Sequence, residues 1–170
     1  MRSAKYSNLY EGIQIWQGEF NPDKKIKADV VIGHSFGAYY ALLNWLKFKN
    51  YKLILVNPPL PQKKILPLIF RWTKYITQEP VYHVKTIAWK YLLSNILNVI
   101  KLHQLNIEEI INQVSRDNLY IIRGVEDKYF CDVASAQFIK NHGWNLIEVP
   151  GCGHNWNKKF DEVIAKLKLQ

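Results

Sequence analysis

The apolar and polar positions of this chain alternate between a pattern typical of buried strands and one typical of amphipathic helices. Short apolar runs rich in β-branched residues predict strands at 29–33, 51–56, 119–122 and 145–149. Apolar residues at helical spacing predict helices after three of these strands, at 36–48, 132–141 and 157–167. Because strands and helices alternate, we expect an α/β fold with a mostly parallel sheet and helices on both faces.

The segment 60–116 departs from this alternation. Its periodicity is helical, aromatic side chains are frequent in it, and prolines at positions 61, 67 and 80 divide it into short pieces. At 170 residues the chain is long enough for one domain and too short for two. We therefore expect a single domain over 1–170, with 60–116 inserted into it as a helical cap.

Few elements are expected before residue 29. Residues 2–11 have the apolar spacing of a short helix, and the alternation over 13–17 predicts a strand. A parallel crossover needs about a dozen residues or more, which the stretch after that strand barely provides. We expect a sheet with a reduced N-terminal part. The protein is then a minimal version of its fold, a homodimer that pairs the exposed edge, or a chain that lacks its natural N-terminus.

The most informative motif is Gly33–Gly37, with the sequence Gly-His-Ser-Phe-Gly, which joins a predicted strand to a predicted helix. A Gly-x-Ser-x-Gly turn in this context is a nucleophile elbow, a strained turn that exposes the hydroxyl of its serine, here Ser35. Gly33 and Gly37 have no Cβ, so we expect the strand and the helix to close around the turn without a clash. The alternative is an ordinary Gly-rich turn at the start of an amphipathic helix.

Two further positions have the residue types that activate a serine. Asp127 follows the predicted strand 119–122, and His154 follows the predicted strand 145–149 within a Gly-rich loop. A serine hydroxyl needs a neighbouring imidazole to accept its proton, and the imidazole needs a carboxylate to hold its tautomer. Because the carboxyl ends of parallel strands meet at one edge of a sheet, we expect Ser35, Asp127 and His154 to lie together there.

With these residues in this order, the chain from about Ala28 to its end resembles the C-terminal portion of an α/β-hydrolase. The resemblance implies a serine hydrolase with Ser35, Asp127 and His154 as its catalytic residues. Such an enzyme cleaves a carboxylic ester or thioester through an acyl-enzyme, without a cofactor or a metal ion. Its partner would be a small-molecule substrate, and the aromatic and leucine side chains of 60–116 suggest an apolar acyl group. The alternative is a non-catalytic α/β-hydrolase-like binding protein.

Two other carboxylates lie near Asp127 in the sequence. Glu126 directly precedes it, but Asp127 has the spacing from Gly124 that is common in the superfamily. Asp132 is well placed as the N-cap of the predicted helix 132–141. We therefore expect Asp127 to be the acid of the site.

The other histidines do not follow the last strand on a Gly-rich loop: His34, His83, His103 and His142. His34 is expected to pack beside the nucleophile or to contact the substrate. Cys131 and Cys152 fall on the two loops that carry the predicted acid and base, where we expect them to line the pocket; a redox pair is the alternative. Two cysteines are too few for a disulfide scaffold and fit a reducing compartment.

An acyl-transfer site also needs donors for the oxyanion. The resemblance assigns one to the backbone N–H of Phe36, the residue after the nucleophile. The second is expected from the loop at 17–20, where the N–H of Glu19 or Phe20 would face Ser35. We expect Gly18 and Phe20 to contact the substrate as well. The alternative is that this loop is only a connection.

The net charge of +9 raises a third possibility, a nucleic-acid-binding domain. The sequence has no basic helix, zinc-ligand spacing or RNA-binding aromatic motif, so no nucleic-acid partner is expected. Between positions 60 and 104 seven lysines and arginines accompany one acid, Glu79, which we interpret as a solvated face; a preference for anionic substrates or a membrane surface is the sharper alternative. The sequence shows neither an apolar run long enough to span a bilayer nor a signal-peptide core, and the expected location is the cytoplasm.

Overall fold

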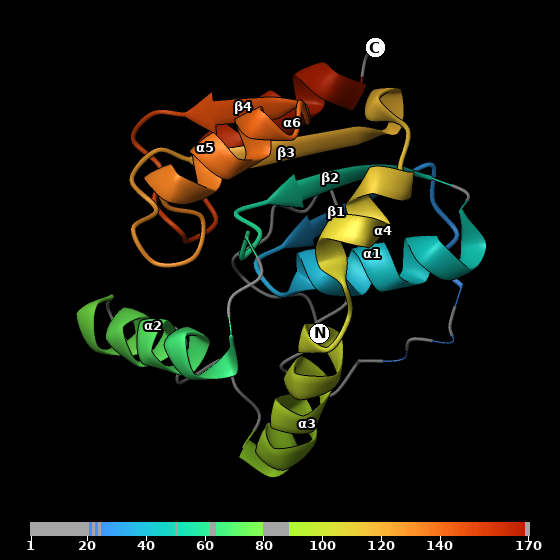
Figure 1. Ribbon diagram of the computed structural model, residues 1–170. Coiled ribbons are helices and arrows are strands. Elements are labelled where there is room, and N and C mark those ends of the chain that lie inside the picture. Colours follow the sequence, from blue (N-terminus) through green and yellow to red (C-terminus); the bar gives the residue numbers. More distant parts are fainter. Residues whose placement is uncertain are drawn as a thin grey trace.

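The computed structural model describes residues 21, 23, 25–49, 51–61, 64–79 and 89–168. In this part of the chain four parallel strands form one sheet, in which their spatial order equals their order in the sequence. They are β1 (Val30–His34), β2 (Lys52–Val56), β3 (Leu119–Gly124) and β4 (Leu146–Val149). The four predicted strands are confirmed, with boundaries that differ by one or two residues. All four end at the same edge of the sheet (Figure 1).

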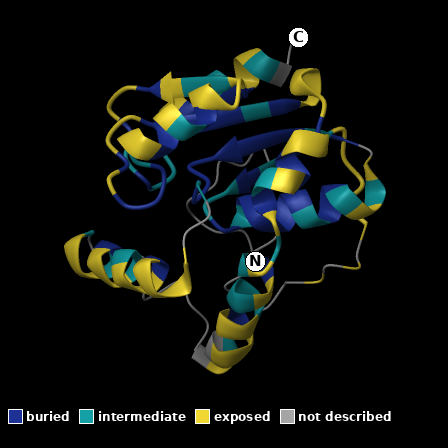
Figure 2. Cartoon of the chain, in the orientation of Figure 1, coloured by how far each residue is buried: buried dark blue, intermediate teal, exposed yellow. Residues whose placement is uncertain are grey.

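Helices cover both faces of this sheet. One face packs against α1 (Gly37–Phe48), α4 (Ile107–Gln113) and α5 (Val133–Asn141), whose buried side chains form one apolar cluster with those of the strands. The other face packs against α6 (Lys158–Lys168) in a second cluster. Figure 2 shows that the two central strands, β2 and β3, are mostly buried, whereas the outer faces of the helices are exposed. The predicted parallel sheet with helices on both faces is confirmed.

β2 shows why the strands read as continuous apolar runs. Leu53 and Leu55 belong to the first cluster, whereas Ile54 and Val56 belong to the second. All four side chains are at most 2% exposed. A strand covered on both sides needs apolar residues at successive positions and not at alternate ones.

Both ends of α5 have the backbone features of helix caps. The Asp132 side chain accepts a hydrogen bond from the backbone N–H of Ser135 at 3.0 Å, which satisfies one of the donors left open in the first turn of a helix. After the helix, Gly143 has a φ of 66°, the left-handed conformation in which many helices end. The predicted N-cap is confirmed.

Between β2 and β3 the chain forms α2 (Ile65–Gln78), η2 (Trp89–Tyr91), α3 (Leu92–His103), α4 and η3 (Arg116–Asn118). α2 and α3 lie farther from the sheet than α4 (Figure 1), and all three helices contribute buried side chains to the first cluster. The described part of the predicted cap is therefore mostly helical. That 60–116 covers a site as a cap remains a prediction.

The elements expected at 2–11 and 13–17, and the loop at 17–20, lie outside the described residues. Among the described strands, β1 and β4 are the two edge strands, each with one described neighbour in the sheet. Pairing of an edge in a homodimer remains a prediction. No helix in the described ranges is long and apolar enough to cross a membrane.

Candidate active site

Ser35 occupies the sharp turn between β1 and α1. Its φ is 55°, a left-handed conformation that is strained in a residue other than glycine. Backbone hydrogen bonds hold the turn: the Ser35 N–H donates to the Val56 carbonyl at 2.9 Å, and the Ser35 carbonyl accepts from the Ala38 N–H at 3.0 Å. A serine in a strained turn between a parallel strand and a helix has the backbone geometry of a nucleophile elbow.

The two glycines of this turn are not equivalent. A Cβ at Gly33 would lie 2.5 Å from the Cα of Ala38 and 2.6 Å from the Gly37 carbonyl oxygen, so the strand and the helix can approach this closely only with glycine there. A Cβ at Gly37 would meet no described atom within 4 Å beyond its own helix backbone and chain neighbours. The prediction that closure needs glycine at both positions is therefore right for Gly33 and wrong for Gly37.

Three side chains at the ends of β1, β3 and β4 form one hydrogen-bonded series. The Oγ of Ser35 lies 3.0 Å from Nε2 of His154, and Nδ1 of His154 lies 2.7 Å from Oδ2 of Asp127. Asp127 is 2% exposed and His154 is 6% exposed. A hydroxyl, an imidazole and a carboxylate at these distances can act as nucleophile, base and orienting group. The structure thus brings together the three residues that the sequence predicts to lie at one edge of the sheet.

The Asp127 carboxylate is fully surrounded by donors. Its Oδ1 accepts from the N–H groups of Tyr129 and Phe130 at 2.9 and 3.1 Å, and its Oδ2 accepts from the N–H of Cys131 at 3.2 Å. Burial raises its pKa, but the hydrogen bond and charge of His154 and these backbone donors outweigh burial and hold the pKa below its usual value. An ionised carboxylate only accepts hydrogen bonds, so Nδ1 of His154 carries the proton. In the neutral imidazole, Nε2 is then the acceptor that faces the serine hydroxyl.

Among the described interactions, the other two carboxylates near the site form no hydrogen bond or ion pair with His154. Glu126 is exposed, and its backbone N–H donates to the main chain of the loop after β4 at 2.9 Å. Asp132 caps α5 and forms an ion pair with Arg71 at 2.8 Å. Asp127 is therefore the carboxylate that holds the imidazole.

His34 contacts the loop that carries His154. Its Nε2 donates to the His154 carbonyl at 2.8 Å, and its ring lies edge-on to that of Trp156 with centroids 5.6 Å apart. This contact supports the loop; the predicted contact of His34 with a substrate stays a prediction. The remaining histidines lie in or beside other helices or outside the described residues: His103, His142 and His83.

Asn57 connects three parts of the site, a role that no sequence motif predicts. Its side chain is completely buried. The Nδ2 group donates to the carbonyls of Gly153 and His154 at 2.9 and 3.1 Å, and Oδ1 accepts from the Gly124 N–H at 2.7 Å. Its φ of 47° is left-handed, a conformation that asparagine tolerates better than most residues. The sequence feature that could have pointed to Asn57 is its place between a buried strand and the pair Pro58–Pro59.

Arg123 holds the loop of Asp127 from within the protein. Its Nε donates to the Cys131 carbonyl at 2.6 Å and its Nη2 to the Val125 carbonyl at 3.0 Å, while Nη1 pairs with Glu148 at 2.7 Å. The residue is only 2% exposed. A buried cation is tolerated when it is paired and hydrogen bonded in this way. Arg123 therefore fixes both ends of the loop that presents the acid.

Aromatic side chains enclose His154. The ring of Phe130 lies 4.5 Å from the imidazole and that of Tyr75 lies 5.2 Å from it, measured between centroids. Tyr75 belongs to α2, and its hydroxyl donates to Oδ1 of Asn155 at 2.6 Å. Beside these rings is a small pocket, whose wall includes Tyr39, Pro59, Leu68, Arg71, Tyr129 and Phe130. α2 thus contributes both to this pocket and to the surroundings of the imidazole.

The two cysteines lie on the expected loops but not in the wall of this pocket. Both are buried free thiols. Burial raises the pKa of the Cys131 thiol and that of Cys152, which keeps both in the unreactive protonated form. The redox pair considered from the sequence is not formed.

Of the two predicted oxyanion donors, one lies within the part of the chain that the structure describes. Phe36 directly follows Ser35 and is the N-cap residue of α1, at the end of the helix where backbone N–H groups lack partners within the helix. Glu19, the second predicted donor, lies outside the described residues, as do the predicted substrate contacts Gly18 and Phe20. Both donor assignments stay predictions.

No family model and no curated protein matches this sequence. Solved structures match its fold. A carboxylesterase of the thaumarchaeon Nitrososphaera gargenis superposes with a TM-score of 0.54 at 14% identity, over 82% of this chain and 64% of that one. The α/β hydrolase MGS-M2 from a deep-sea metagenome gives 0.48 at 15% identity, over 83% and 65% of the two chains. Rv0554 of Mycobacterium tuberculosis gives 0.48 at 13% identity, over 82% and 63%.

The protein therefore has the α/β-hydrolase fold, as the resemblance of its motifs predicts. The parallel strand order, the elbow after β1 and the superposition on the carboxylesterase agree on this. The chain spans less than two thirds of the length of these structures. Since one fold hosts many functions, the function has to be argued from the site.

Proposed function

We propose that the protein is a serine hydrolase of the carboxylesterase or thioesterase type. Ser35 is the nucleophile, His154 the general base and Asp127 the residue that orients it. The observation that carries this proposal is the unbroken hydrogen-bonded series from the Ser35 hydroxyl through His154 to Asp127, at the end of a strained elbow. Such a series makes a hydroxyl nucleophilic at the moment of attack.

In the first half of the reaction the Oγ of Ser35 attacks the carbonyl carbon of the ester or thioester, while Nε2 of His154 accepts the hydroxyl proton. The Asp127 carboxylate stabilises the imidazolium that forms. The tetrahedral intermediate collapses as the imidazolium gives its proton to the leaving alcohol or thiol. The acyl group remains on Ser35 as an ester.

In the second half a water molecule attacks the acyl ester, and His154 accepts one proton from it. Collapse of the second tetrahedral intermediate breaks the bond to Ser35, and the imidazolium returns the proton to the serine oxygen. The acyl group leaves as a carboxylic acid. No cofactor takes part in these two half-reactions.

An apolar acyl group suits the surroundings of the site. Phe130 and Tyr75 are in ring contact with His154, and Leu68 adds an aliphatic wall to the pocket beside them. The proposal places the acyl chain of a small-molecule substrate against these side chains. α2 would then act as part of the cap.

Labelling with a fluorophosphonate probe tests the proposal. We expect the wild-type protein to be labelled and Ser35→Ala to remain unlabelled with an unchanged melting temperature. Ser115→Ala, which alters an exposed serine far from the elbow in sequence, is the control and should label like the wild type. Labelling that persists in Ser35→Ala would contradict the assignment of the nucleophile. A folded wild-type protein that takes up no probe would favour the alternative, a non-catalytic protein that binds a ligand at the same place.

A further inference from the structure

α2 carries an apolar stripe on the face that is turned away from the site. Leu66, Ile69 and Phe70 are 76%, 52% and 71% exposed, and their spacing of three and four residues puts them on one side of the helix. The opposite side carries Leu68 and Tyr75, each 6% exposed. α2 is therefore apolar on two sides, and the protein covers only one of them.

α3 repeats this arrangement. Leu93, Ile96 and Leu97 are 72%, 42% and 50% exposed and have the same spacing. α2 and α3 both lie on the side of the molecule away from the sheet (Figure 1). We call these six side chains the outer stripes. A concentration of exposed apolar side chains of this kind marks an interaction surface.

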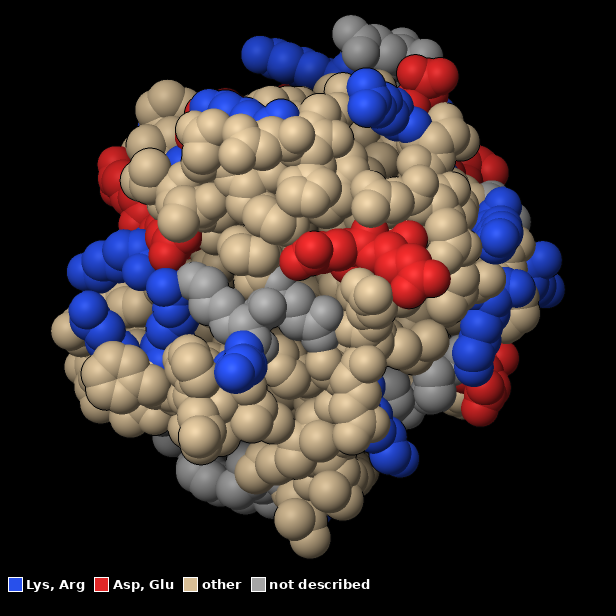
Figure 3. Space-filling view, viewed as in Figure 1, with Lys and Arg blue, Asp and Glu red and all other residues tan. Residues whose placement is uncertain are grey.

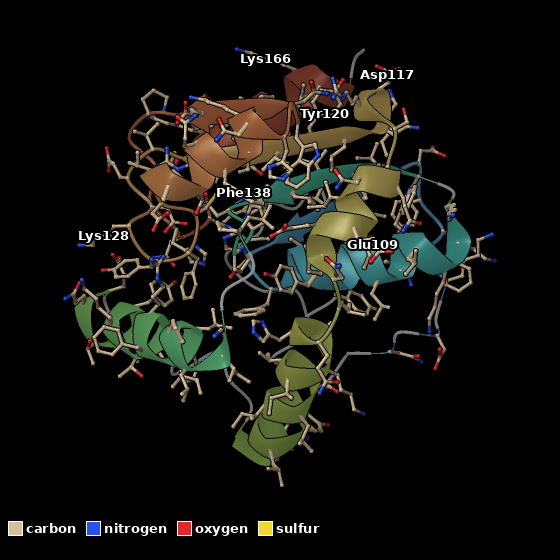
Figure 4. All side chains as sticks on the ribbon, in the orientation of Figure 1. Glu109, Asp117, Tyr120, Lys128, Phe138 and Lys166 are labelled. Carbon is tan, nitrogen blue, oxygen red and sulfur yellow. The ribbon has the colours of Figure 1, made fainter. Side chains whose placement is uncertain are left out.

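Cations accompany the outer stripes, and acids are almost absent. Between positions 60 and 104, Glu79 is the single acid beside seven lysines and arginines. The lysines of this stretch that the structure describes are all exposed: Lys64, Lys74, Lys90 and Lys101. Lys128 adds a further cation near the C-terminal end of α2 (Figure 4). Figure 3 shows Lys and Arg side chains beside uncharged ones on the surface over α2, at the left of the view.

We propose that the outer stripes bind a membrane surface that contains anionic lipid. Apolar side chains on such a helix enter the boundary between headgroups and acyl chains, while the lysines attract the anionic headgroups. A second copy of this chain fits less well, because pairing through these faces would bring the exposed lysines of α2 and α3, such as Lys74 and Lys101, against those of the other copy, at a net charge of +9 for each copy. A lipid surface satisfies both the apolar and the cationic features.

Contacts of α2 with the candidate site would place a bound membrane close to that site. Nη1 of Arg71 donates to the Tyr129 carbonyl at 2.9 Å, and the Tyr75 hydroxyl donates to Asn155 at 2.6 Å. A membrane bound to the outer face of α2 would therefore lie roughly 10 Å, the width of one helix, from the loops of the site. The inference goes beyond the proposed function and does not depend on it.

Sedimentation of the full chain with lipid vesicles tests the inference. We expect binding to vesicles of phosphatidylcholine mixed with phosphatidylglycerol, little binding to phosphatidylcholine alone, and weaker binding as the salt concentration rises. The double variant Leu66→Ser, Phe70→Ser should lower the vesicle partition coefficient by about tenfold or more, since several methylene groups no longer insert. Both side chains are more than 70% exposed, so the melting temperature should not change.

A matched pair of lysines tests the charge. Lys74→Glu on α2 should weaken binding to the anionic vesicles several-fold. Lys166→Glu on α6, an exposed lysine far from α2 in Figure 4, should have much less effect. Equal effects of the two lysine variants would overturn the proposal, because binding would then depend only on net charge.

Three other results would also overturn the membrane assignment. The first is a wild-type protein that stays in the supernatant with both kinds of vesicle at low salt. The second is a double variant that binds as well as the wild type. The third is a dimer in gel filtration that the double variant converts to a monomer, which would assign the outer stripes to a second copy. Fluorophosphonate labelling reports on Ser35 alone, so failure of this proposal is distinguishable from failure of the proposed function.

Discussion

The side-chain amide of Asn57 donates a hydrogen bond to the main-chain carbonyl of His154 at 3.1 Å. The same side chain binds the Gly153 carbonyl and the Gly124 N–H. One buried residue thus fixes the loop of the imidazole against the ends of β2 and β3. The distance from His154 to Ser35 depends on that loop, so we regard Asn57 as a positioning residue.

Asn57→Ala would leave the Gly124 N–H and one or two carbonyls buried without this partner. An unsatisfied buried polar group costs about 1–3 kcal/mol, and we expect the free energy of unfolding in urea to fall by that amount. The rate of fluorophosphonate labelling should also fall under conditions where the variant is fully folded. Asn141→Ala, at an exposed asparagine in the last turn of α5, should change neither quantity. A folded Asn57→Ala protein with the wild-type labelling rate would refute the positioning role.

Two neighbouring acids test the assignment of Asp127. Asp127→Asn removes the carboxylate that holds the tautomer of His154, and a loss of this kind lowers turnover by about 10⁴-fold. Glu126→Gln changes an exposed side chain that does not contact His154 and should lower turnover only slightly. Hydrolysis of an activated ester by the two variants measures the difference. A larger loss in Glu126→Gln would show that the acid is assigned to the wrong residue.

The site residues that the sequence predicts are those that lie in the loops directly after a strand. Ser35, Asp127 and His154 each follow a strand of the parallel sheet, so the strand pattern alone places them at one edge. Asn57 also follows a strand, but its role lies in contacts with Gly153, 96 positions further along the chain. No local pattern encodes a partner at that distance.

Two other features depend on tertiary packing in the same way. The predicted strand 119–122 stops before Arg123 because a charged side chain is rarely buried, yet β3 continues through it since Glu148 and two carbonyls satisfy the guanidinium. The motif predicts that glycine is needed at Gly37, whereas among the described residues a Cβ clashes at Gly33 and not at Gly37. Such differences follow from how strand and helix approach each other, which residue types alone do not specify.

The two elbow glycines provide a matched test of this point. Gly33→Ala would put a Cβ 2.5 Å from the Cα of Ala38, so β1 and α1 would have to separate. Overpacking of this kind costs about 1–3 kcal/mol, and displacement of Ser35 should abolish labelling. Gly37→Ala adds a Cβ with no atom of the described residues within 4 Å beyond its own helix backbone and chain neighbours, and alanine is favoured over glycine in a helix by up to about 1 kcal/mol. In thermal unfolding, Gly33→Ala should therefore have a lower melting temperature than the wild type, and Gly37→Ala should not. Equal destabilisation by both changes would refute this difference between the two glycines.

The ionisation of Asp127 predicts a dependence of stability on pH. In the folded protein its pKa is held below the usual value, which is about 3.9 in an unfolded chain. The carboxylate therefore stabilises the folded state at higher pH, and this contribution is lost as the pH falls through the folded-state pKa. The asparagine of Asp127→Asn does not titrate, so the variant lacks this pH-dependent contribution to stability. We expect the free energy of unfolding to fall more steeply in the wild type than in the variant as the pH drops below about 4, where the unfolded chain begins to bind the proton. Parallel curves in urea unfolding would contradict this expectation.

The pocket beside Phe130 predicts a preference for the length of the acyl chain. Each buried methylene contributes about 0.8 kcal/mol, or roughly fourfold in kcat/KM, so kcat/KM should rise with acyl length until the pocket is full. Leu68→Ala shortens a side chain of the pocket wall and should shift the optimum to a longer chain. Val133→Ala, at a residue that is 74% exposed and outside that wall, should leave the optimum unchanged. The measurement is kcat/KM for esters of one alcohol with acids of increasing length. A flat or falling series would show that the acyl group does not bind against these side chains.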